Sequence, residues 1–127
     1  MLMYKLLLVT ANKDSFSDFA STFSKHSVVE LSWAESGGAA LDMVENRPID
    51  LVVVDEDLGD MRGLKLAFQL LFVNPMINCA VASDLSHEDF HEASEGLGLM
   101  AQLPLQPGAE QVDSLFRQLK KIKNISG

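Results

Sequence analysis

The residues best suited to chemistry follow a largely apolar run near the middle of the chain. Residues 49–54 are succeeded by three acidic side chains, Asp55, Glu56 and Asp57. A carboxylate at the end of a buried strand can accept a phosphoryl group as a nucleophile, or it can bind a hard divalent cation such as Mg²⁺. An Asp after a strand is also a common turn or cap residue, so position alone leaves a purely structural role open.

Other reactive side chains form weaker patterns. His87 and His91 have a helical spacing that can hold a transition metal, but a solvent-exposed helix face explains them better, and residues 87–91 lack the order of the HExxH metalloprotease motif. Cys79 is the only cysteine, which excludes an internal disulfide and a zinc site built from cysteines. We expect Cys79 to be a buried core residue in a reducing compartment.

Length and composition indicate a single globular domain. The chain has 127 residues, of which 47% are hydrophobic and 22% charged, and its formal net charge is −8. The acidic balance argues against direct nucleic-acid binding and against adhesion to a membrane through a basic face. Apolar runs are too short for a membrane span or a signal-peptide core. We therefore expect a cytoplasmic domain over residues 1–124, with 125–127 as a tail or the start of a linker.

Apolar periodicity predicts alternating strands and helices. Strand-like runs occupy residues 4–9, 28–31, 49–54, 79–82 and 99–103. Helical stripes lie between and after them: Phe16, Phe19, Ala20 and Phe23; Ala40, Met43 and Val44; Leu64, Ala67, Phe68 and Leu71; Phe90, Ala93 and Leu97; Val112, Leu115, Phe116 and Leu119. Ser15 and Ser86, each with Asp three residues later, resemble helix N-caps.

This alternation predicts an α/β domain with helices on both faces of a parallel sheet. Five βα units in a chain of this length indicate the flavodoxin-like (βα)5 doubly wound sandwich of three layers, with strand order 2-1-3-4-5. Its topological switch point lies between the first and third strands. Residues 10–12 and 55–57 leave the carboxyl ends of those strands, so we expect the functional site there.

Residues 50–55, with Gly63 eight positions after Asp55, look like the phosphoacceptor segment of bacterial response-regulator receiver domains, the phosphorelay modules of two-component signalling. Residues 5–9 resemble the first strand of that family, and residues 34–41 its second loop and helix. Gly98 and Gln106-Pro107 are similar to residues around its fifth strand. The resemblance implies that Asp55 occupies the phosphoacceptor position, Ser83 the switch Ser/Thr position and Gln106 the position of a Lys that contacts phosphoryl oxygens.

The chain departs from this pattern where the family binds Mg²⁺. Thr10 and Ala11 stand where receivers have acidic ligands, which leaves Asp55 and Asp57 as metal candidates, with Asn12 as a partial substitute, so binding is expected to be weak or absent. Further departures are Gln106 for Lys, Gly59 for Pro and Leu103 for an aromatic switch residue. The resemblance therefore implies an atypical, non-enzymatic receiver, a pseudo-receiver with no certain cofactor, in which Asp55 is a residual or vestigial phosphoacceptor.

Such a module works through protein partners, which the resemblance gives as a sensor kinase, an output domain of the same polypeptide or another receiver. A homodimer through the face between the fourth and fifth helices is possible on the same basis. Two other functions stay open. A small haloacid-dehalogenase-like phosphohydrolase would use Asp55 as nucleophile and Asp57 as general acid/base. A flavodoxin-like nucleotide or flavin binder would use the hydroxyl-rich loop over residues 10–15.

Overall fold

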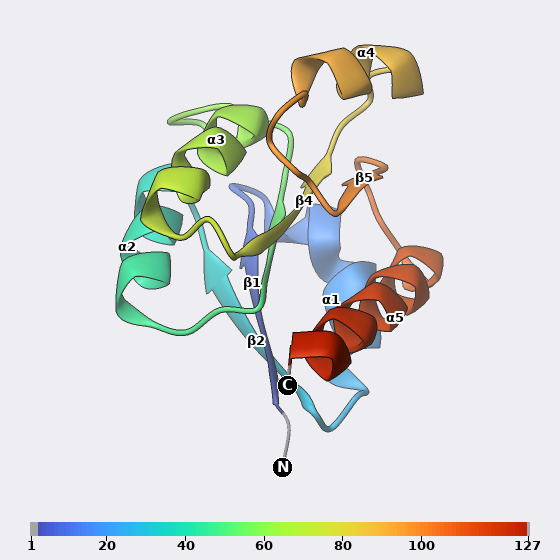
Figure 1. The fold of residues 1–127 in the computed structure, drawn as a ribbon. Coiled ribbons are helices and arrows are strands. Elements are labelled where there is room, and N and C mark those ends of the chain that lie inside the picture. The colour runs from blue at the N-terminus through green and yellow to red at the C-terminus, as the bar shows by residue number, and fades with distance from the viewer. Residues whose placement is uncertain (1–2, 127) are drawn as a thin grey trace.

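The sheet has five parallel strands in the order β2-β1-β3-β4-β5, which confirms the predicted flavodoxin-like topology (Figure 1). The computed structural model describes residues 3–126, with side chains through residue 122. The strands are β1 (Tyr4–Val9), β2 (Val29–Ala34), β3 (Leu51–Val54), β4 (Asn78–Ala82) and β5 (Ala101–Leu103). Each overlaps the apolar run that predicted it.

Helices cover both faces of this sheet. They are α1 (Ser17–Ser24), preceded by the 3-10 turn η1 (Lys13–Phe16), α2 (Gly37–Asn46), α3 (Gly63–Val73), α4 (His87–Ala93) and α5 (Ala109–Ser126). Helices α1 and α5 pack on one face, and α2, α3 and α4 lie on the other (Figure 1). None of the described helices is long and apolar enough to cross a membrane.

Two local expectations need correction. Helix α5 continues through Ser126, so residues 125 and 126, expected as a tail, belong to the helix; Gly127 lies outside the described residues.

Ser86 caps α4 as predicted, because its hydroxyl accepts a hydrogen bond from the N–H of Asp89 at 3.1 Å. Ser15 caps no helix: it lies inside η1, which Asn12 begins by accepting a hydrogen bond from the N–H of Asp14.

The core has two apolar layers because strand side chains alternate between the faces of the sheet. In β1, Leu6 and Leu8 enter the layer under α1 and α5, while Leu7 and Val9 enter the layer under α2 and α3. All four are fully buried, as is every residue of β3. These central strands form a rigid base whose carboxyl ends carry Thr10 and Asp55.

The buried face of α3 differs from the prediction. Leu66, Ala67 and Leu70 pack against the sheet, whereas Phe68, expected in the core, is 48% exposed. The expected stripe fails because α3 is apolar almost all round, so more than one stripe fits its sequence. The buried stripe begins at Gly63, which lies close to the backbone at the end of β3.

Candidate functional site

Thr10 and Asp55 meet at the switch point of the sheet. Val9 and Val54 are register partners at the ends of β1 and β3, so the residues that follow them are adjacent. The Thr10 hydroxyl oxygen lies 2.6 Å from Asp55 Oδ2 and 2.9 Å from the carbonyl oxygen of Asn12. Its single hydrogen is assigned to the shorter contact, to Asp55, and the hydroxyl oxygen accepts from the N–H of Asn12 at 3.0 Å. Thr10 is one of two polar residues buried in the described chain. The hydroxyl thus occupies the side of Asp55 where the family resemblance implies acidic residues.

Both carboxylate oxygens of Asp55 have neutral donors. Oδ2 accepts from Thr10, and Oδ1 accepts from the backbone N–H of Glu56 at 2.9 Å. The Asp55 N–H in turn donates to the carbonyl of Val9 at 2.9 Å. The carboxylate is therefore held by local hydrogen bonds, of which the one from Thr10 links β1 to β3.

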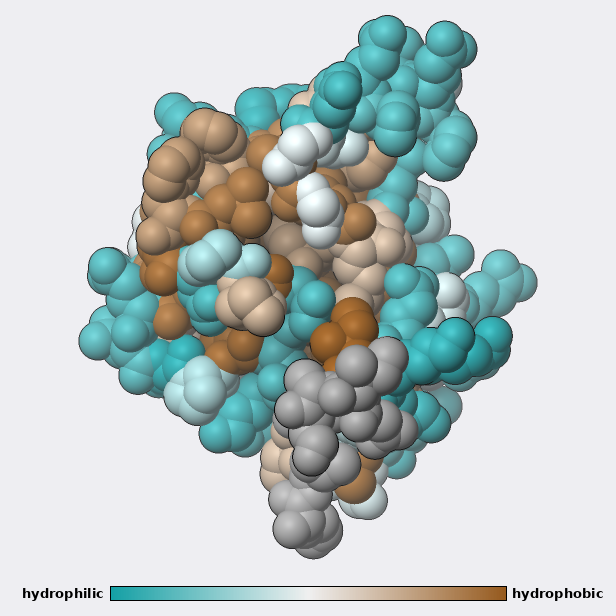
Figure 2. All heavy atoms as spheres, in the orientation of Figure 1, coloured by the Kyte–Doolittle hydropathy of each residue, from teal (hydrophilic) through white to brown (hydrophobic). Residues whose placement is uncertain are grey.

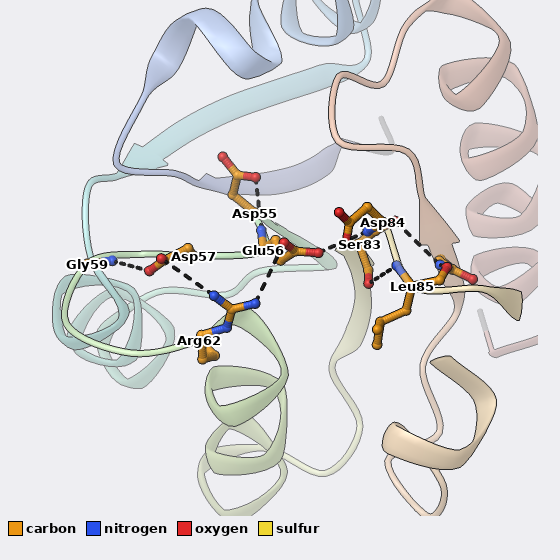
Figure 3. A network of polar contacts seen from close by, with 9 residues as sticks. Asp55, Glu56, Asp57, Gly59, Arg62, Ser83, Asp84 and Leu85 are labelled. Carbon is orange, nitrogen blue, oxygen red and sulfur yellow. Dashed lines mark hydrogen bonds and ion pairs between the residues drawn. The ribbon is translucent and has the colours of Figure 1, made fainter. Parts of the chain in front are cut away.

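The second expected acid, Asp57, faces its own loop. Its Oδ1 accepts from the N–H of Gly59 at 3.0 Å, and its Oδ2 lies 3.5 Å from a guanidinium nitrogen of Arg62. Figure 3 shows this carboxylate directed toward Gly59 and Arg62 rather than toward Asp55. Over the described part of the chain, no three His, Cys, Asp or Glu side chains are grouped to hold a metal ion. Proteins usually bind Mg²⁺ through one or two carboxylates with waters completing the octahedron, and with Asp57 turned toward Gly59 and Arg62 only Asp55 of the two expected acids is left for that role.

Glu56 joins the two loops beside the site. One carboxylate oxygen accepts from the backbone N–H of Asp84 at 2.9 Å, and the other lies 3.6 Å from Arg62 (Figure 3). The contact ties the β3–α3 loop to the β4–α4 loop. Sequence reasoning missed it because neither the position of Arg62 nor that of Asp84 follows from a motif.

Ser83 is held within its own turn. It follows β4, is buried, and accepts a hydrogen bond at Oγ from the N–H of Leu85 at 3.1 Å. The amide of Gln102, in β5, donates to the carbonyl of Leu85 at 2.9 Å and fixes the same turn. Among the described residues, no hydrogen bond links Ser83 to Asp55. Ser83 lies on the expected edge of the sheet, while Gln102 is a supporting residue that no sequence pattern indicated.

Gln106 stands apart from the other expected site residues. It is exposed in the loop between β5 and α5, and its side chain makes no hydrogen bond with any described residue. Ala11 is exposed as well. The structure therefore brings Thr10 and Asp55 into contact and places Ser83 on a nearby strand end, while the Gln106 side chain has no hydrogen-bond partner among the described residues.

Gly63 is required by the close approach of α3 to β3. A Cβ atom at this position would collide with the carbonyl oxygen of Asp55, and the Gly63 N–H donates to the carbonyl of Glu56 at 2.9 Å. Gly59, in the loop between them, has a φ of 84°, which glycine adopts without the penalty of a side chain. The two glycines let the chain turn tightly around the acidic segment.

Asp60 links this loop to α2. Its two carboxylate oxygens accept from the N–H groups of Gly37 at 2.9 Å and Gly38 at 3.0 Å, at the helix N-terminus. These hydrogen bonds, that from Gly37 first, hold the pKa of Asp60 below its usual value. Sequence reasoning missed this cap because the acid lies more than 20 residues from the helix it serves.

The space between the two loops is a cavity of about 100 Å³. Its lining includes the side chains of Glu56, Arg62, Leu64 and Leu85. The N–H groups of Asp84 and Leu85 at its edge already donate to Glu56 and Ser83, and Arg62 already faces two carboxylates. An incoming anion would have to displace these internal acceptors.

Comparison with known proteins agrees with this architecture. No family model and no curated protein matches the chain. A signal receiver domain of an HD domain-containing protein from Pseudomonas fluorescens Pf-5 superposes with a TM-score of 0.84 at 16% identity, covering 99% of this chain and 93% of that one. A CheY-like receiver domain protein from Methanospirillum hungatei JF-1 superposes with a TM-score of 0.83 at 16% identity, covering 96% of this chain and 98% of that one. A two-component response regulator from Legionella pneumophila superposes with a TM-score of 0.79 at 20% identity, covering 93% of this chain and 98% of that one. The chain has the fold of response-regulator receiver domains.

Proposed function

We propose that this chain is an atypical receiver-type signalling domain that acts by protein–protein interaction, with Asp55 as a structural rather than an efficient phosphoacceptor residue. The receiver fold supports the signalling class. The observation that carries the rest is the hydrogen bond from Thr10 to Asp55, which replaces an acidic metal ligand with a neutral hydroxyl.

Phosphoryl transfer to Asp55 would meet an unfavourable charge distribution. A carboxylate oxygen must form a bond to phosphorus while the leaving group departs with its electron pair, and cations normally offset the negative charge of both partners. The loop that follows Asp55 carries two acids, Glu56 and Asp57, and its cation, Arg62, lies within ion-pair distance of both. Arg62 is already paired with both of these acids, so little positive charge is left for a phosphoryl group.

The two alternative functions have less support from the site. A phosphohydrolase would need Asp57 as acid/base beside the nucleophile, and Asp57 instead contacts Gly59 and Arg62. A phosphate-binding loop would need free N–H donors after β1, and the Asn12 N–H is already bonded to the Thr10 hydroxyl. Neither arrangement favours a small phosphate ligand.

Intact-mass measurement after incubation with Mg²⁺ and acetyl phosphate tests the proposal. We expect no mass increase corresponding to a phosphoryl group in the unaltered chain, and none in Asp55→Asn. A conventional receiver assayed in parallel verifies that the donor is active. A near-complete adduct in the unaltered chain that disappears in Asp55→Asn would show a working phosphoacceptor and overturn the proposal.

A further inference from the structure

Helix α4 has few buried contacts with the rest of the domain. Of its seven residues only Phe90 is buried, whereas α3 buries four. A cavity of about 330 Å³, lined by residues of both elements, lies between α4 and β5. Figure 1 shows α4 projecting beyond the other helices, and Figure 2 shows hydrophilic side chains gathered over it. A segment with few buried apolar contacts opens at low cost in free energy, so the position of α4 depends on the chain that leads into it.

The segment that leads into α4, residues 83–86, is held from two sides. On one side, the amide of Gln102 in β5 donates to the carbonyl of Leu85 at 2.9 Å. On the other side, the carboxylate of Glu56 in the β3–α3 loop accepts from the N–H of Asp84 at 2.9 Å. Among the described residues, this is the only hydrogen bond between the segment and that loop. We call it the Glu56 bridge; Figure 3 shows it beside Arg62.

Glu56 is well placed to keep this bridge closed. Its acceptor is a carboxylate, which forms a stronger hydrogen bond with an N–H group than a neutral oxygen does. The Glu56 side chain is only 25% exposed, so water competes little for it, and Arg62 lies 3.6 Å from its other oxygen. The backbone of Glu56 is fixed as well, because its N–H donates to Asp55 and its carbonyl accepts from the N–H of Gly63. The carboxylate is therefore held in position before it meets the segment.

We propose that Glu56 is a positioning residue that fixes the entry to α4 and thereby holds this helix in one place. When the Glu56 bridge is broken, residues 83–86 keep only their bonds within the segment and to β5, and the cavity beside α4 leaves room for the helix to shift. The bridge thus acts as a conformational lock between two loops at the edge of the sheet. It belongs to the unphosphorylated chain and does not depend on the role proposed for Asp55.

Hydrogen–deuterium exchange of the full chain at neutral pH, without a phosphodonor, tests the proposal. Glu56→Ala removes the acceptor of the bridge. We expect the amides of residues 84–94 to exchange at least about tenfold faster in this variant, because opening no longer breaks a hydrogen bond to a charged group. Glu56→Gln keeps an oxygen that can accept from the N–H of Asp84, so it should give a clearly smaller increase.

Asp57→Ala is the matched control. It removes the same charge from the same loop and the other ion-pair partner of Arg62, but Asp57 has no contact with the segment before α4. Exchange over residues 84–94 should be unchanged in it, and far-ultraviolet circular dichroism should show all variants folded.

Four results would overturn the proposal. The amides of residues 84–94 could exchange at the same rate in Glu56→Ala as in the unaltered chain, or they could be unprotected in both. Asp57→Ala could accelerate them as much as Glu56→Ala, which would make loop charge the cause. Glu56→Gln could be as fast as Glu56→Ala, or Glu56→Ala could unfold altogether, which would make Glu56 a support of the whole domain and not of α4.

Discussion

The hydroxyl of Thr10 lies 2.6 Å from the carboxylate of Asp55 and donates a hydrogen bond to it across the junction of β1 and β3. The acceptor is a carboxylate, so this is a charge-assisted hydrogen bond, which is stronger than one between neutral groups. Through this bond the side chains that follow the two central strands are joined at the edge of the sheet.

Removing the Thr10 hydroxyl should destabilise the domain. In Thr10→Val the side chain keeps its shape but Asp55 Oδ2 loses its donor, and we expect the free energy of unfolding to fall by about 1–3 kcal/mol. Urea denaturation at neutral pH measures the loss. Thr10→Ser, which retains the hydroxyl, should lose clearly less. Equal stability of Thr10→Val and the unaltered chain would mean that this hydrogen bond contributes nothing.

Introducing acids at the end of β1 should create a response to Mg²⁺. In Thr10→Asp/Ala11→Asp, three carboxylates would lie together, which lowers stability without a cation because like charges repel. Mg²⁺ binding to the folded state should reverse this, raising the melting temperature of the double variant by several degrees at millimolar Mg²⁺. The unaltered chain should not respond. A variant indifferent to Mg²⁺ would show that the surrounding loops, and not the missing acids, prevent binding.

The strands and their order follow from the sequence because a fully buried parallel strand leaves a continuous apolar run. Residues 51–54 are four apolar residues in succession, and the structure buries all of them. The position of Asp55 at the carboxyl end of this run, next to Thr10, follows from the same pattern. Local sequence and global topology agree here, since a central strand of a parallel sheet is buried on both faces and accommodates such a segment.

The contacts around Asp55 did not follow from the sequence. The Glu56–Asp84 hydrogen bond joins residues 28 positions apart, and its existence depends on the conformations of two loops. The face of α3 was ambiguous for the opposite reason, because too many of its residues are apolar. Phe68 satisfies helical periodicity as well as Leu66 does, and only packing against the sheet distinguishes them.

Asp60 should make stability depend on pH. The N–H groups of Gly37 and Gly38 hold its pKa below the unfolded value, so its contribution is complete above the ordinary pKa of an aspartate and is lost as pH falls through the folded value. Asp60→Asn should therefore be less stable than the unaltered chain at pH 7, and the difference should shrink toward pH 3. Urea denaturation at both pH values measures it.

Asp42→Asn is the control for this effect, because Asp42 is an exposed acid of α2 whose side chain makes no hydrogen bond with any described residue. It changes the net charge by the same amount as Asp60→Asn but leaves the helix cap intact. Should the two variants lose stability equally at pH 7, general charge would account for the effect and capping by Asp60 would not.

Cys79 should be unreactive in the folded protein. It lies in β4 within the layer under α3, and burial raises the pKa of its thiol to about 12. The thiolate is the reactive form, so both access and ionisation oppose modification. At pH 8 we expect a disulfide reagent such as dithionitrobenzoate to label the unfolded protein in urea completely, and the native protein only as fast as it opens. Prompt labelling under native conditions would place the thiol at the surface and contradict the packing of β4.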